Sequence, residues 1–134
     1  MNWVRIIEAG FLASVLASFT DWHFFGIMFH DRYYTNAGVW RKYADKKDEI
    51  RSITFGTILG SVASFVFVIF ASYLGLTAFP SALAVAGVLW LMIPLPLLLT
   101  NSLFMRIDRA LVVSHALGWL ARLVVSALCV SWFL

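Results

Sequence analysis

Four long apolar stretches dominate this sequence of 134 residues. Each has the roughly 20 residues that an α-helix needs to cross the hydrocarbon core of a bilayer. They cover about residues 3–29, 53–76, 80–104 and 110–134. A spanning backbone has few alternatives to the helix, because every peptide group must form its hydrogen bond within the protein. The sequence therefore predicts an all-α integral membrane protein, a single transmembrane domain built as a four-helix bundle.

The composition agrees with this reading. Hydrophobic residues make up 62% of the chain and charged residues only 13%, whereas a soluble domain carries roughly 25% charged residues. The excess apolar surface has to face lipid, so the bilayer is the first expected partner. The single cysteine, Cys129, excludes an internal disulfide and a cysteine-based metal cluster within one chain. We interpret the net charge of +3 as contact with anionic lipid head groups and expect no nucleic-acid partner.

The first stretch has one feature of a secretory signal peptide, the basic residue Arg5 at its start. Glu8 and Asp21 interrupt its apolar run, however, and the stretch exceeds the length of a signal-peptide core. We therefore expect it to be a retained transmembrane helix.

The basic residues predict an orientation. Eight of the ten Lys and Arg residues lie in the loop at about 31–52 or in the connection between the last two spans, and only Arg5 lies at the opposite side. Cytoplasmic loops carry such an excess, so both connections are predicted to be cytoplasmic and both termini extracytoplasmic. This describes a multi-pass protein of the cell inner membrane. The eight residues are Arg32, Arg41, Lys42, Lys46, Lys47, Arg51, Arg106 and Arg109.

The loop at about 31–52 has a partly helical pattern, in which Val39, Trp40, Tyr43, Lys47 and Ile50 fall near helical spacing. One interpretation is a short helix at the membrane surface; the other is a charged connector that happens to be helical. The residues predicted to contact the lipid surface are Trp40, Arg41, Lys42, Tyr43, Lys46 and Lys47.

Two further patterns concern helix packing. Gly56, Gly60 and Ser64 repeat at four-residue spacing, which is typical of membrane helices that approach closely, within one chain or between two copies. Pro94 and Pro96 lie inside the third span, where each removes a backbone donor and clashes with the preceding turn. The second span is therefore expected to have a tight neighbour, and the third to be kinked.

Inserting a charged residue at the centre of a membrane helix costs about 2.5–3.5 kcal/mol of free energy on insertion scales, so each ionisable residue in a span is expected to have a structural or functional role. At the rise of an α-helix, His23 and His115 reach similar depths, and Arg122 can extend toward Asp21 if the first and last spans are neighbours. The predicted polar cluster is therefore Asp21, His23, His115 and Arg122. The wider set of candidate binding residues adds His30 and Asn101.

This cluster supports several interpretations. The plainest is a structural ion pair that fixes helix register, in a structural or accessory subunit that binds a partner subunit or a second copy of itself. A proton-coupled small-molecule transporter would use the carboxylate and the imidazole as carriers. A haem or metal protein would use facing histidines as ligands, and a membrane enzyme would use the same groups as acid and base. No spacing assigns a cofactor, a metal ligand set or a catalytic residue.

The layout resembles a group of small four-span bacterial membrane proteins that is defined only as a domain of unknown function. The resemblance implies a fold and no activity, and His23 and His30 do not belong to its pattern. The four-helix membrane glutathione transferases have a similar length, but their motif on the second helix is absent here. The residues that carry the resemblance are Ala9, Gly10, Ala13, Ser14, Ala17, the aromatic stretch 22–29 with Gly26, Trp40, His115, Gly118 and Trp119.

Overall fold

The computed structural model describes residues 2–35 and 41–134, and within these ranges all regular structure is helical. Four segments are long and apolar enough to cross a membrane: Trp3–Met28, Lys46–Tyr73, Phe79–Phe104 and Arg109–Phe133. The protein is therefore a multi-pass membrane protein of four spanning segments. The helices are α1 (Trp3–Asp21), η1 (Trp22–Met28), α2 (His30–Thr35), α3 (Lys46–Tyr73), α4 (Phe79–Met92), α5 (Pro94–Phe104) and α6 (Arg109–Phe133).

Polar side chains set the start of three of these helices. The side-chain oxygens of Asn2, Asp45 and Asp108 accept hydrogen bonds from backbone N–H groups in the first turns of α1, α3 and α6, at 3.1, 2.8 and 2.7 Å. Such caps satisfy donors that have no partner within the helix. Asp45 starts α3 seven residues before the predicted beginning of the second span, and the helix ends at Tyr73.

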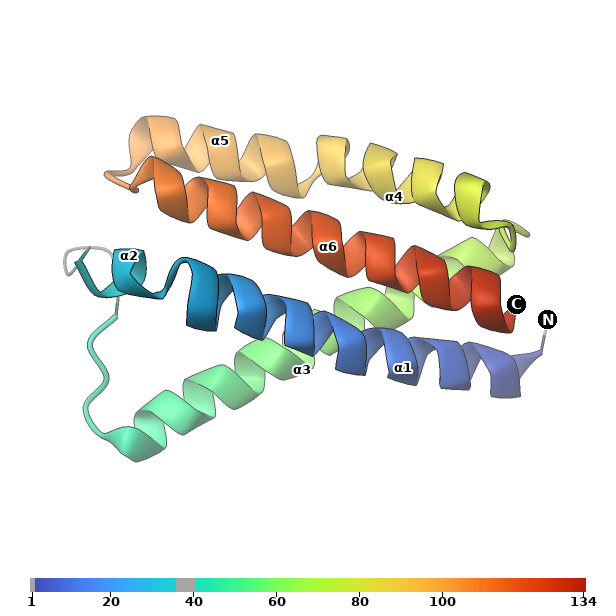
Figure 1. The fold of residues 1–134 in the computed structure, drawn as a ribbon, viewed down its shortest axis with the longest axis horizontal. Coiled ribbons are helices and arrows are strands. Elements are labelled where there is room, and N and C mark those ends of the chain that lie inside the picture. Colours follow the sequence, from blue (N-terminus) through green and yellow to red (C-terminus); the bar gives the residue numbers. More distant parts are fainter. Residues whose placement is uncertain (1, 36–40) are drawn as a thin grey trace.

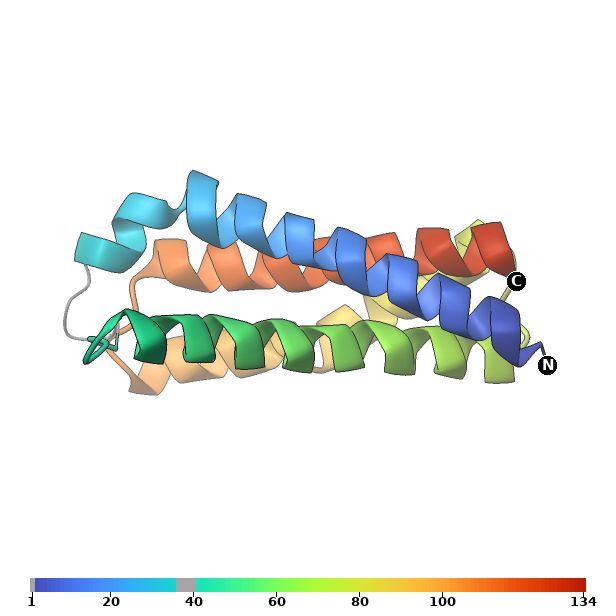
Figure 2. The ribbon, with the colours of Figure 1, turned by 90° about the horizontal axis from the view of Figure 1, so that it is seen from below.

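Helix α6 is the centre of the bundle. It lies between α1 and the α4–α5 pair, while α3 crosses the bundle obliquely, with its first turns apart from α6 (Figure 1). Turned by 90°, the view shows α3 running along the full length of the bundle (Figure 2). Half of the most apolar part of α6 is buried, against 17% for α3 and for the α4–α5 segment. The outer faces of these last segments are therefore free for lipid.

Small residues allow α1 to approach its neighbours. Ala9, Gly10, Ala13 and Ala17 are buried along one side of α1. A Cβ atom on Gly10 would lie 2.6 Å from a ring carbon of Phe65 on α3, so only glycine fits this crossing. Close packing of this kind replaces the hydrophobic effect, which does not drive association inside a bilayer.

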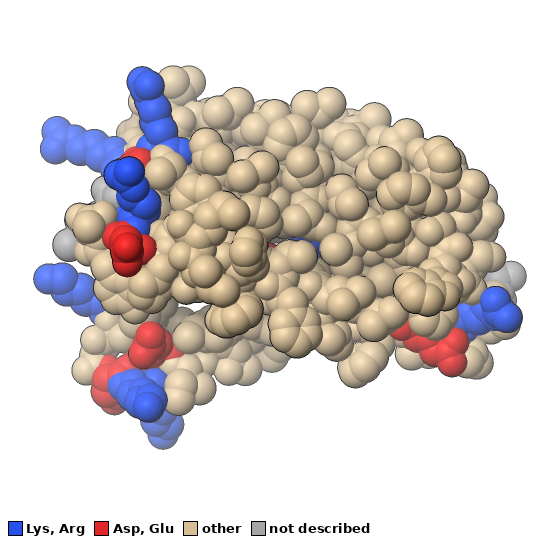
Figure 3. Space-filling view, viewed as in Figure 1, with Lys and Arg blue, Asp and Glu red and all other residues tan. Residues whose placement is uncertain are grey.

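Both chain ends lie at the same end of the bundle (Figure 1). There the Arg5 guanidinium donates a hydrogen bond to the carbonyl of Phe133 at 3.2 Å, which joins the start of α1 to the end of α6. Charged side chains gather at the two ends of the molecule, most of them at the end opposite the termini, with a broad belt of other residues between (Figure 3). This distribution is typical of a protein whose middle is in hydrocarbon.

The third span is interrupted, as its prolines predict. Helix α4 ends at Met92 and α5 begins at Pro94, with Ile93 between them at φ −118° and ψ −75°. The indole N–H of Trp90 donates to the carbonyl of Ala116 on α6 at 2.8 Å, one turn before the break. The interruption therefore lies beside a fixed contact with the central helix.

The turn between α3 and α4 requires a glycine. Gly75 has a φ of +68°, in the left-handed region where other residues are strained. The N–H of Leu76 donates to the carbonyl of Ala71 at 2.9 Å, which closes the end of α3 in the arrangement known as the Schellman motif.

The predicted surface helix in the loop is wrong for the residues that the structure describes. Residues 41–45 are not helical, and the segment that follows is the first turn of α3. The physical reason is the cap at Asp45, together with an ion pair of 3.1 Å between Arg41 and Asp48 that holds the approach to it. Val39 and Trp40 lie outside the described residues, and the lipid-surface role of this loop stays a prediction.

Candidate functional site

The main polar feature of the bundle is an ion pair between Asp21, the last residue of α1, and Arg122 on α6. Arg122 is only 4% exposed and also donates a hydrogen bond of 3.4 Å to the hydroxyl of Ser64 on α3. Three spanning segments thus meet at one guanidinium. An arginine buried at this depth needs such partners, because an unpaired charge in hydrocarbon is costly.

The second span makes room for this side chain. A Cβ atom on Gly60 would lie 2.7 Å from Cζ of Arg122, closer than real contacts allow. Gly60 and Ser64, two of the regularly spaced small residues of α3, therefore accommodate the guanidinium of Arg122. A Cβ on Gly56 would meet nothing within 4 Å, so no described helix of this chain packs there. Packing of Gly56 against a second copy stays a prediction.

The ion pair lies in the middle part of the membrane-spanning region. A Cβ on Gly118 would lie 3.9 Å from an Asp21 carboxylate oxygen, which puts Asp21 level with Gly118. Gly118 is about 14 Å along α6 from Arg109, by the rise of 1.5 Å per residue. Since the hydrocarbon core is about 30 Å thick, the pair is close to its centre.

Directly after Asp21 the first span changes from an α-helix to a π-helix, η1. The widened turn continues to its end, where the N–H of Phe29 bonds to the carbonyl five residues back, that of Phe24, at 3.0 Å. Such segments are rare and frequently occur at functional sites. In this protein η1 carries Phe25 to the side of α6 that holds His115, with 4.8 Å between the ring centroids.

A cavity of about 280 Å³ adjoins the ion pair. Its wall on α3 ends in Gly56 and Leu59, both exposed, so the cavity opens sideways between α3 and the other helices. In Figure 3 a recess in the middle of the uncharged belt reveals charged atoms below the surface. The lining residues are Asp21, Phe25, Gly56, Leu59, Gly60, His115, Trp119 and Arg122.

His115 is a cavity residue whose hydrogen-bonding groups are not used by the described residues. Its ring contacts the rings of Phe25 and Tyr33, at centroid distances of 4.8 and 5.8 Å, and it forms no hydrogen bond with any described residue. An imidazole has one donor and one acceptor in its neutral form. Both are therefore available to a molecule in the cavity.

Tyr33 closes this region on the loop side. It is buried, and its hydroxyl donates to the hydroxyl of Ser114 on α6 at 3.1 Å, which fastens α2 to the central helix. Burial raises the pKa of Tyr33, so the phenol remains a hydrogen-bond donor at neutral pH.

The structure brings together Asp21, His115 and Arg122, three of the four residues of the predicted cluster. His23 is exposed on η1 beside Phe24, and it does not line the cavity. The prediction rests on depth, and a residue two positions after Asp21 points to nearly the opposite side of a helix. His30 is exposed against Tyr34, and Asn101 lies on α5 away from the cavity.

Metal and haem chemistry gains no support from this arrangement. In residues 2–35 and 41–134, no three His, Cys, Asp or Glu side chains are grouped as a metal site would require. Among the described residues the rings that contact His115 are those of Phe25 and Tyr33, so this part of the chain does not form the facing histidines of a haem site.

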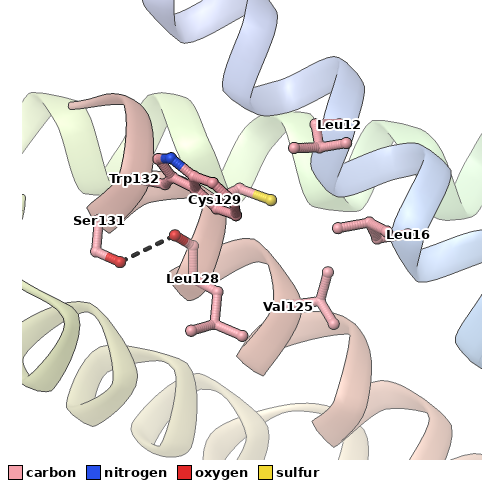
Figure 4. Close-up of a pocket in the computed structure, with 7 residues that line it drawn as sticks. All are labelled: Leu12, Leu16, Val125, Leu128, Cys129, Ser131 and Trp132. Atoms are coloured by element: carbon pink, nitrogen blue, oxygen red, sulfur yellow. Dashed lines mark hydrogen bonds between the residues drawn. The ribbon is translucent and has the colours of Figure 1, made fainter.

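A second, larger cavity of about 440 Å³ lies between α1 and α6 toward the chain ends. Leu12 and Leu16 face Val125, Cys129 and Trp132 across it (Figure 4). Its one hydroxyl, on Ser131, already donates to the carbonyl of Leu128 at 2.9 Å. This lining, mostly apolar side chains with the thiol of Cys129, is suited to an apolar chain.

Sequence reasoning missed the aromatic and hydroxyl neighbours of the site. Phe25 and Trp119 belong to the aromatic pattern of the family resemblance, which assigned them no role in a site. Tyr33, Ser114 and the π-helix have no signal that separates them from other parts of apolar helices. Gly60 and Ser64 did have a signal, their regular spacing, but its cause is the arginine of another helix.

Fold and site together define a small helical membrane protein with a buried ion pair at the edge of a lateral cavity. The chain matches the family described as "Protein of unknown function (DUF1761)" over residues 9–131. It belongs to this family, which confirms the expected resemblance to membrane proteins defined as a domain of unknown function. No curated protein and no solved structure matches the chain.

Proposed function

We propose that the protein binds a small lipid-soluble molecule in the cavity beside the Asp21–Arg122 pair. The observation that carries this proposal is His115, whose imidazole forms no hydrogen bond with residues 2–35 or 41–134 and lines a cavity shared with a buried ion pair. Polar groups inside a membrane that line a cavity commonly mark a ligand pathway. A purely structural pair needs neither the cavity nor the histidine.

Filling the cavity provides the test. Gly56→Leu places a side chain where nothing lies within 4 Å of the added Cβ, so the fold tolerates it while the cavity is occupied. Gly87→Leu on α4 is the matched control, because its Cβ also meets open space but lies away from the cavity. Both variants and the wild type are purified in mild detergent, and bound small molecules are extracted and measured by mass spectrometry.

We expect a bound molecule in near-stoichiometric amount in the wild type and in Gly87→Leu, and its loss from Gly56→Leu. Equal amounts in all three proteins, or none in the wild type after mild extraction, would contradict the proposal.

A second candidate is the accessory subunit that binds a partner helix or a second copy. The observation that favours it is the outward face of α3, where Gly56 and Thr57 are exposed in a segment otherwise rich in large apolar residues. Small and hydroxylated residues are typical of contacts between membrane helices.

Thr57→Leu changes this face without entering the cavity lining. Loss of a larger assembly on size-exclusion chromatography with light scattering would favour this candidate, and an unchanged mass would exclude Thr57 as a contact.

We further propose that the protein lies in the cell inner membrane with both termini outside. The charged residues support this orientation, since the end of the bundle opposite the termini holds eight of the ten Lys and Arg residues.

A further inference from the structure

The charge balance of the cavity restricts what it binds. The carboxylate of Asp21 and the guanidinium of Arg122 neutralise each other near the centre of the membrane. A ligand with a net charge would bring an uncompensated charge to this depth, where even one charged group is costly. The site is therefore suited to a neutral molecule.

The hydrogen-bonding groups restrict it further. Arg122 offers only donors, and His115 offers a ring N–H that no described residue accepts. Arg122 engages one oxygen of the Asp21 carboxylate. The site therefore offers N–H donors together with acceptor positions on Asp21 and His115, which suits a ligand whose ring oxygens accept hydrogen bonds as carbonyls or donate them as hydroxyls.

The shape of the cavity favours a flat ring. Its volume of about 280 Å³ is just below the range of roughly 300–1,000 Å³ that is typical of pockets for whole ligands. The rings of Phe25, His115 and Trp119 line the cavity, and α3 contributes Leu59 with two glycines, Gly56 and Gly60, that add no side chain. Aromatic walls stack well on a planar group. The rest of the ligand has to extend through the lateral opening into the lipid.

We propose that the cavity binds the head group of a lipid-soluble quinone or its quinol. This inference rests on the proposed ligand-binding function and names the chemical class of the ligand: a neutral, planar ring with oxygen acceptors and an apolar tail. His115 binds a ring oxygen, the aromatic side chains contact the ring, and the tail lies in the bilayer. The proposal concerns binding only, and no electron transfer is included.

The probe is a ubiquinone analogue with a short side chain, titrated by calorimetry into the protein in mild detergent. His115→Phe keeps a ring of similar size and removes the hydrogen bond, and we expect it to raise Kd about tenfold, the effect of one lost hydrogen bond. His23→Phe is the matched control, the same replacement at an exposed histidine of η1, and should leave Kd unchanged. Gly56→Leu should abolish binding, and circular dichroism checks that each variant is folded.

A long-chain alcohol and oleate serve as competing probes without a ring. Quinone binding that His115→Phe does not weaken, or a ringless probe that binds more tightly than the quinone, would overturn the assignment to quinones. A ringless probe whose binding Gly56→Leu abolishes would still leave the cavity as a ligand site, so the proposed function would stand. If no probe binds and no molecule is extracted from the wild type, both proposals fail.

Discussion

At the scale of single residues, Arg122 determines the choice of its neighbours. It forms an ion pair with Asp21, donates to Ser64 and occupies the space beside Gly60. Its Cζ also lies 5.7 Å from the ring of Trp119, within the range of a cation–π contact. These residues lie on different helical turns, and each gives the buried guanidinium an ion pair, a hydrogen bond, a ring contact or space.

The ion pair makes the first prediction. Arg122→Leu leaves the carboxylate of Asp21 without its partner inside the membrane, and we expect it to lower the free energy of unfolding by about 3 kcal/mol. The double variant Asp21→Leu with Arg122→Leu removes both charges and should recover most of that loss. Unfolding by detergent titration in mixed micelles measures both values. A double variant as unstable as the single one would show that the pair itself, not the unpaired charge, sets the stability.

A second prediction concerns the space beside Arg122. Gly60→Ala adds a Cβ that overlaps the guanidinium, so the arginine has to move. Overpacking of this kind costs about 1–3 kcal/mol. Gly56→Ala, one turn away in open space, should leave Tm unchanged or raise it slightly, because alanine favours the helix. Equal Tm values for both variants would mean that Arg122 is not held in this position.

At the scale of the elements, the molecule depends on interruptions of regular helix. The first span becomes a π-helix after Asp21, the third breaks at Ile93, and the turn after α3 needs the positive φ of Gly75. The π-helix shapes the cavity, because it sets which residues of the first span face α6. The proline break could be expected from the sequence, since proline has no N–H to donate. The π-helix could not, because its residues also suit an α-helix.

The turn after α3 gives a prediction at this scale. Gly75→Ala forces a Cβ into the left-handed region, which costs about 1–2 kcal/mol. Gly87→Ala, within α4 and in open space, should be neutral or slightly stabilising, because alanine favours the helix. Thermal unfolding followed by circular dichroism compares the two. A Gly75→Ala variant as stable as the wild type would mean that the turn adopts another conformation.

At the scale of the whole molecule, both termini lie at one end and most of the basic residues at the other (Figures 1 and 3). A chain that crosses the membrane four times ends on the side where it began, so both termini have to lie at one end. Which end faces the cytoplasm depends on the orientation in the bilayer, and the basic residues predict that orientation.

The orientation is tested with single cysteines in a chain that carries Cys129→Ser, since Cys129 is the only native cysteine. Asn2→Cys should react with a membrane-impermeant maleimide on intact spheroplasts, and Lys47→Cys only after the membrane is opened. The reverse pattern would show that the termini are cytoplasmic.

The sequence by itself determined the number of spans, their approximate limits and the proline break, because apolar length and missing donors act locally. It also indicated the Asp21–Arg122 pair, since depth in a membrane follows from counting residues along a helix. Only the tertiary structure decided which faces meet. Asp21 faces α6 while His23 is exposed outside the cavity, and the oblique path of α3 places a stripe of small residues in the wall of a cavity. Which faces meet depends on contacts between helices that are distant in the sequence. Spans that are apolar on all sides have no hydrophobic periodicity from which these faces could be predicted.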